Sequence, residues 1–88
     1  MELEIVRHLF QAGVPLIAGT DTFGFTGIAP GISLQKELQI LREAGLSPYD
    51  VLKTATVNPA VFLNKDHEFG QIVVGQQADL VLLDGNPL

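Results

Sequence analysis

The chain has 88 residues and a net charge of −5, with ten acidic against five basic side chains, so it holds at most one domain and lacks the basic surface that nucleic-acid binding requires. The chain contains no cysteine, which excludes disulfides and thiolate metal sites. Residues 2–13 are too charged for a signal peptide, and no apolar run approaches the roughly 20 residues of a membrane span. We therefore expect a cytoplasmic protein without membrane contact. Hydrophobic residues nevertheless make up 47% of the sequence, which is high for so small a domain, so part of this apolar surface is expected to face a partner.

The first part of the chain predicts a helix and then a buried strand. Apolar side chains of residues 2–12 fall on one helical face, and Gly13 follows at the position where a glycine commonly ends a helix. The run of residues 14–18 is apolar without interruption, which is typical of a parallel strand buried on both faces. Residues 23–32, rich in glycine and proline, are expected to form a loop.

Three helices are expected in the middle of the chain, because apolar residues recur there at helical spacing and each stretch opens with a capping residue. The expected ranges are residues 34–44, 47–56 and 58–63. The expected caps are Ser33, Ser47 and Asn58, of which the last two are each followed by a proline in the first helical turn. Gly45 is expected to end the first of these helices.

The C-terminal part predicts two short strands, residues 71–74 and 79–84, with a turn at Gly75. The order helix, strand, three helices, two strands makes the chain an α/β protein. We expect one folding unit in two parts. Residues 1–64 carry the first strand with its flanking helices, and residues 65–88 carry the final strands.

Asp21 is the strongest candidate for chemistry. Two residues separate it from the apolar run 14–18, and ligand sites in parallel sheets gather beyond the carboxyl ends of the strands. A carboxylate at such a place can bind a divalent cation and take a proton from a metal-bound water. An Asx-turn or a cap without chemistry is the alternative interpretation, and the residues alone leave both open.

Other chemistry-bearing residues favour structural roles. His8 lies on the polar face of the first helix and His67 lies in a polar loop, so both are expected to be solvated. The chain has no third histidine, so a zinc site of three or four ligands cannot be built from one copy at any usual spacing. The glycines of residues 23–32 lack the Gly-Lys-Ser/Thr of a phosphate loop, and Ser33 and Ser47 are not in a nucleophile elbow.

Three longer stretches follow one another along the chain: "AGVPLIAGTD", "SLQKELQILREAGLSPYDVLKTATVNPAVFL" and "GQIVVGQQADLVLLDGNPL". Together they resemble the metal-dependent amidohydrolase superfamily, in its imidazolonepropionase-like and prolidase-like branch. The first is similar to the eighth barrel strand with its terminal Asp, the second to the helices that follow it, and the third to the return of the chain into a small β-sandwich. The resemblance covers nearly all of the chain, and the combination of the three stretches makes it specific.

The resemblance implies the C-terminal fragment of a (β/α)8 barrel together with returning strands of the accessory β-sandwich. Residues 1–64 would then hold the last barrel strand with its flanking helices, and residues 65–88 would hold sandwich strands. The implied reaction is hydrolysis of a C–N bond in a small-molecule amide, cyclic amide or peptide. The implied cofactor of the full-length family is a divalent metal, with zinc as the expected ion.

The resemblance also assigns roles to residues. Asp21 matches the Asp that closes the eighth strand, which binds the metal or takes a proton from the metal-bound water. Thr22, Gly24 and Gly27 fall in the loop that would contact substrate. Gln35 stands where many relatives carry a histidine, so no role is transferred to it. The family's remaining ligands, among them a His-x-His pair on the first strand, are not in this sequence.

Two hypotheses follow for the chain itself. In the first it is one segment of a hydrolase, with Asp21 as a catalytic and metal-binding carboxylate. In the second it is a non-catalytic fragment or an oligomerising module. In either case we expect the isolated chain to hold no metal and to be inactive. Because its strands lack neighbours, we also expect a homo-oligomer joined through residues 14–18 or 80–83.

Overall fold

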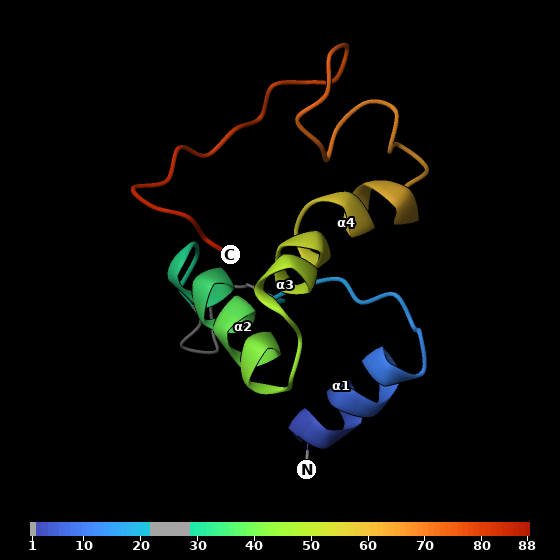
Figure 1. The fold of residues 1–88 in the computed structure, drawn as a ribbon, viewed down its shortest axis with the longest axis vertical. Coiled ribbons are helices and arrows are strands. Elements are labelled where there is room, and N and C mark those ends of the chain that lie inside the picture. The colour runs from blue at the N-terminus through green and yellow to red at the C-terminus, as the bar shows by residue number, and fades with distance from the viewer. Residues whose placement is uncertain (1, 22–28) are drawn as a thin grey trace.

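The structure is a computed structural model that describes residues 2–21 and 29–88, and the described part contains four short helices (Figure 1). The helices are α1 (Glu2–Gln11), α2 (Ile32–Glu43), α3 (Pro48–Thr54) and α4 (Val57–Phe62). Each lies within two residues of the range that the sequence predicts, so the expectation of four helices is confirmed. None of these helices is long and apolar enough to cross a membrane.

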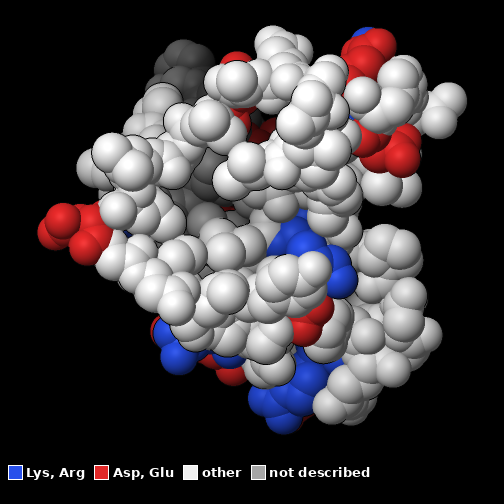
Figure 2. Space-filling view, turned by 45° about the horizontal axis from the view of Figure 1, so that its top comes forward, with Lys and Arg blue, Asp and Glu red and all other residues white. Residues whose placement is uncertain are grey.

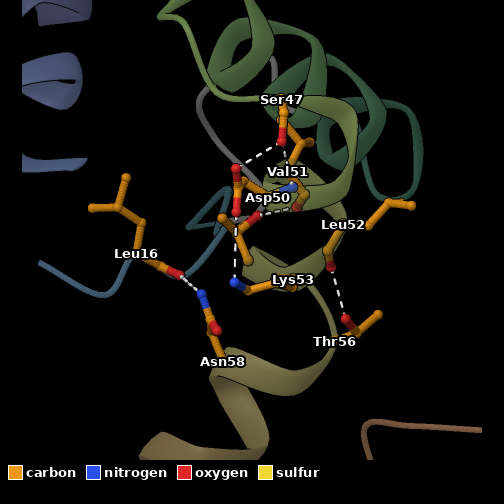
Figure 3. Close-up of polar contacts among 9 residues, drawn as sticks. Leu16, Ser47, Asp50, Val51, Leu52, Lys53, Thr56 and Asn58 are labelled. Atoms are coloured by element: carbon orange, nitrogen blue, oxygen red, sulfur yellow. Dashed lines mark hydrogen bonds and ion pairs between the residues drawn. The ribbon is translucent and has the colours of Figure 1, made fainter. Parts of the chain in front are cut away.

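The start of α3 is capped as the sequence predicts. Ser47 is the N-cap, and its Oγ accepts a hydrogen bond from the backbone N–H of Asp50 at 3.1 Å (Figure 3). The same hydroxyl donates to the Asp50 carboxylate at 2.6 Å. Lys53, one turn further on, lies 3.5 Å from that carboxylate. The first turn of α3 is thereby held by its own side chains, which is why a helix of seven residues forms here.

The other two expected caps are wrong. Helix α2 begins before Ser33, so this serine lies inside the first turn, where its Oγ accepts a hydrogen bond from the backbone N–H of Ala29 at 2.9 Å. Helix α4 begins before Asn58, with Thr56 at the N-cap and no side-chain cap bond. The Asn58 side chain instead donates to the carbonyl of Leu16, far away in the sequence. A tertiary hydrogen bond has replaced the local one that the sequence suggests.

The hydrophobic core lies where α2 and α3 meet, with α1 packed against it. Its buried members are Leu41, Ala44, Leu46 and Val51. Half-buried side chains from α1, from α2 and from the segment after α1 complete it: Leu3, Val6, Phe10, Leu16, Ala18 and Leu38. Arg7 ties α1 to the end of α2, because its Nε donates to the carbonyl oxygen of Ala44 at 3.0 Å. A cation at a helix C-terminus is also favoured by the helix dipole.

No β-strand forms within residues 2–21 and 29–88, although the sequence predicts three (Figure 1). Residues 14–18, 71–74 and 79–84 run without helical turns and without a ladder of hydrogen bonds to a neighbour. A helix satisfies its backbone within its own sequence, whereas a strand needs a second strand beside it. The C-terminal segment, residues 71–88, is exposed apart from the half-buried Gln76, and Val74 and Leu82 are fully so, at 102% and 99%. The expected strands 71–74 and 79–84 therefore have no partner strand among residues 2–21 and 29–88.

Candidate functional site

The segment that leads to Asp21 has the burial pattern of a strand. Burial alternates from residue to residue over 15–21: Leu16, Ala18 and Thr20 are half-buried, whereas Pro15, Ile17, Gly19 and Asp21 are exposed. A period of two is the signature of extended backbone, in which successive side chains point to opposite faces. The expectation that residues 14–18 are buried on both faces is wrong for this chain, because the helices cover only one face and leave Ile17 44% exposed.

Main-chain contacts hold the segment against the helices. The backbone N–H of Val14 donates to the carbonyl of Leu9 at 3.0 Å, which fixes its start at the end of α1. The N–H of Ala18 donates to the carbonyl of Thr54, the last residue of α3, at 2.9 Å. From α4, Asn58 Nδ2 donates to the Leu16 carbonyl at 2.8 Å, and the side chain points across the gap to that oxygen in Figure 3.

Asp21 lies at the end of this segment with its side chain exposed. Its φ of 51° is in the left-handed region, which Asp and Asn enter far more readily than other side chains. The backbone thus turns at the residue that carries the carboxylate, as expected for the end of a strand. The expected substrate-binding residues, Thr22, Gly24 and Gly27, lie outside the described residues.

The described residues do not fit a catalytic metal by themselves. No three side chains of His, Cys, Asp or Glu converge in the part of the chain that the structure describes. His8 is exposed on α1, and His67 Nε2 lies 3.7 Å from Glu68 Oε1 on the surface. A catalytic zinc takes three protein ligands and an open position, and Asp21 can supply one of them.

Basic side chains are scattered on the face shown in Figure 2. Figure 2 shows a face on which uncharged residues predominate and the Lys and Arg side chains lie in separate groups. The expectation that nucleic acid is not a partner rests on the acidic balance of the sequence and stays a prediction.

A cleft of about 260 Å³ opens beside the first part of the segment, away from Asp21 in the sequence. Its walls include Phe10 of α1, Pro15 and Leu16 of the segment, and Lys53 and Asn58 of the helices that follow. The cleft lies along residues 13–16, and no sequence pattern singled out its lining, because the residues come from separate elements.

Sequence reasoning missed two residues that hold the segment, Thr54 and Asn58. Thr54 is 1% exposed, and its Oγ donates to the Val51 carbonyl at 2.6 Å, so it is locked inside the core. Its own carbonyl is the acceptor for Ala18. The only signal in the sequence was Asn58 before a proline, which indicated a cap and concealed the longer contact.

Residues 2–88 match the model of the Amidohydrolase family. The chain belongs to this family. It is 35% identical over 79 residues to an imidazolonepropionase of Geobacillus sp. (strain WCH70), a match that covers 89% of this chain and 18% of that protein. It is 34% identical over 88 residues to an ochratoxinase of Aspergillus niger, covering 98% of this chain and 17% of the relative.

A third amidohydrolase relative extends the same pattern. The imidazolonepropionase of Streptococcus gordonii is 32% identical over 79 residues, covering 89% of this chain and 25% of that protein. The chain therefore spans a quarter or less of the length of these relatives. The resemblance that the three quoted stretches carry is confirmed by these matches.

Membership in the amidohydrolase family has consequences for the fold and the chemistry. The family has a TIM-barrel type of fold, and its members are generally metal-dependent hydrolases of C–N bonds. Four helices and one strand-like segment make up only a fraction of such a barrel.

Proposed function

We propose that this chain is the segment of a metal-dependent amidohydrolase that contributes Asp21 to the active site, and that the full-length protein hydrolyses a C–N bond in an amide, cyclic amide or peptide. The position of Asp21 is the observation that carries the proposal. It is exposed at the end of a strand-like segment whose other face packs on helices, in a chain of this family. In a barrel, the ends of such strands form the catalytic face.

Asp21 would act on protons. An exposed carboxylate at the strand end can accept a proton from the attacking water and deliver it to the leaving nitrogen, so that the amine departs in neutral form. Such a role typically contributes about 10²–10⁴-fold to a rate. A divalent metal, with zinc as the expected ion, would polarise the substrate carbonyl when bound. Asp21 would supply one of its oxygen ligands, and the other ligands would come from strands outside this chain.

The remaining assignments follow from position in the chain. Thr22, Gly24 and Gly27 directly follow Asp21 and would line the mouth of the barrel, where loops after strands contact substrate. Residues 1–64 would complete the barrel, and residues 65–88 would enter the β-sandwich. The exposed apolar side chains of the C-terminal segment support the second assignment, since an apolar run of this kind is normally covered by a partner surface.

An activity screen tests the proposal. The longer protein that carries this segment is assayed on N-acyl amino acids, dipeptides and cyclic amides, before and after treatment with a chelator. We expect turnover of at least one class, its loss on chelation, and its return when Zn²⁺, Mn²⁺ or Co²⁺ is added. Turnover that is indifferent to the chelator, or no turnover of any of the three classes, would contradict the proposal.

A second candidate function is a non-catalytic module that assembles with copies of itself. One observation favours it: many large apolar side chains are exposed in this chain, among them Ile72, Val81 and Leu82. The reading frame in the source genome discriminates between the two. A frame that continues upstream with the missing barrel strands supports the hydrolase, and a frame without them supports the module.

A further inference from the structure

The junction between α3 and α4 contacts the segment that carries Asp21 through two hydrogen bonds. Thr54, at the end of α3, accepts from the N–H of Ala18 at 2.9 Å through its carbonyl oxygen. Asn58, in the first turn of α4, donates from Nδ2 to the Leu16 carbonyl at 2.8 Å across 42 residues of sequence (Figure 3). We call this pair of bonds the junction clamp.

The two bonds of the junction clamp use the same backbone groups of the segment as one rung of a parallel sheet does. In extended backbone the carbonyl of one residue and the N–H of the second residue after it point to the same edge of the chain. One residue of a parallel neighbour strand bonds to just such a pair. Here the Thr54 carbonyl and the Asn58 side-chain amide together replace that neighbouring residue, and they bond on either side of Ile17. The junction clamp therefore fixes the register of the segment without a neighbouring strand.

The donor and the acceptor of the junction clamp are themselves well anchored. Thr54 is 1% exposed and bonded through Oγ to α3, so its carbonyl has little freedom. Asn58 is half-buried at the wall of the cleft beside residues 14–16. The side chains of Leu16 and Ala18 pack on the same hydrophobic core that holds α3. Main chain and side chains thus fix the same stretch, three to five residues before Asp21.

We propose that Asn58 is a positioning residue for Asp21: its bond to the Leu16 carbonyl, with the bond between Thr54 and Ala18, sets the register of the segment and so the place at which the carboxylate is presented. The structural part of this inference stands on the contacts alone, and its catalytic part rests on the proposed function of Asp21. A slip by one residue would turn every side chain of the segment to the other face. Even a displacement of about 1 Å at a reacting group can cost on the order of 10²-fold in rate.

Two substitutions of Asn58 separate its bond from the stability of α4. Asn58→Asp keeps the shape of the side chain and loses the N–H donor, while an acidic residue in the first turn favours the helix. Asn58→Ala removes the whole side chain. The matched control is Ser47→Ala, which removes the cap of α3 and so weakens the fold at a site that makes neither bond of the junction clamp.

Hydrogen exchange of backbone amides in the 88-residue chain is the first readout, because it reports local opening. With both Asn58 variants we expect the Ala18 amide to exchange at least about 10-fold faster relative to the Ala44 amide, which bonds within α2 to Ile40. With Ser47→Ala the ratio of the two rates should stay as in the wild type. An unchanged ratio in the Asn58 variants would overturn the inference.

Kinetics of the full-length protein are the second readout. We expect both Asn58 variants to lower kcat by about 10- to 100-fold with little change in KM, and Ser47→Ala to keep kcat near the wild-type value. A normal kcat in the Asn58 variants, in an enzyme that Asp21→Asn inactivates, would overturn the positioning role and leave the proposed function standing. A normal kcat in Asp21→Asn itself would overturn the proposed function and the catalytic part of this inference, whereas the exchange result would still decide the structural part.

Discussion

Gly70 lies close to α4 at the start of the C-terminal segment. Its replacement by alanine should strongly lower the free energy of unfolding. A Cβ at this position would lie 3.0 Å from the Cβ of Ala60, 3.1 Å from the carbonyl oxygen of Thr56 and 3.4 Å from the Cα of Val57. Ala60 is fully buried, so it has no free space into which it can move. The φ of Gly70 is +109°, which an L-residue rarely adopts. The substitution therefore adds backbone strain and a steric clash together.

Each of the two costs has a typical size. Strained backbone costs about 1–3 kcal/mol, and overpacking costs about 1–3 kcal/mol more. Gly75 provides the matched control, because its φ is +94° and a Cβ there meets nothing within 4 Å. Gly75→Ala should thus carry the strain alone. We expect Gly70→Ala to lower the free energy of unfolding by about 1–3 kcal/mol more than Gly75→Ala does.

Urea denaturation at low temperature, followed by far-UV circular dichroism, measures this difference. The two variants and the wild type are compared at equal protein concentration, since association would shift the midpoints. Equal losses of the free energy of unfolding in both variants would show that the clash with α4 contributes nothing to the stability difference. A Gly70→Ala variant as stable as the wild type would show that the close approach of Gly70 to Ala60 does not exist in solution.

Three further outcomes are expected. Ser47→Ala should lower the free energy of unfolding by about 1 kcal/mol, seen as a lower urea midpoint with an unchanged slope, and an unchanged midpoint would show that the cap contributes nothing. The isolated chain should not hydrolyse any N-acyl amino acid, dipeptide or cyclic amide with added Zn²⁺, Mn²⁺ or Co²⁺, because Asp21 can supply only one of the three protein ligands that a catalytic zinc takes. Chelator-sensitive turnover by the isolated chain would contradict this. Sedimentation at micromolar concentration and physiological salt should reveal a homodimer or larger oligomer. The net charge of −5 opposes association only weakly there, because charges more than about 8 Å apart are largely screened. A compact monomer would contradict the expected association.

The helices of this chain could be predicted from the sequence because their determinants are local. Ser47 and the proline after it mark the start of α3, and Gly45 follows the end of α2, as expected. Residues 71–74 and 79–84 also carry clear strand patterns, yet no ladder forms in the described residues. Strand formation depends on a partner, and the pattern of one strand says nothing about whether its partner is in the same chain.

Only part of the candidate site, like only part of the fold, could be predicted from the sequence. Asp21 could be singled out as a candidate from the sequence, because a carboxylate after an apolar run is a local pattern. The contact of Asn58 with the segment before Asp21 could not be recognised, because the residue has a plausible local role as a cap and its acceptor, the Leu16 carbonyl, lies 42 residues away. The burial of only one face of residues 14–18 was likewise not predictable, since it depends on which elements pack on the segment.

The kcat of Asp21→Asn in the full-length enzyme decides whether Asp21 takes part in the reaction. Asparagine keeps the shape of the side chain and tolerates the φ of 51°, so the change removes the charge and the basicity without straining the backbone. Asp66→Asn, at an exposed aspartate in the polar loop after α4, is the matched control. We predict that kcat falls by about 10²–10⁴-fold in Asp21→Asn, with unchanged thermal stability, and stays near the wild-type value in Asp66→Asn. A kcat near the wild-type value in Asp21→Asn would show that Asp21 is a turn residue without a catalytic role.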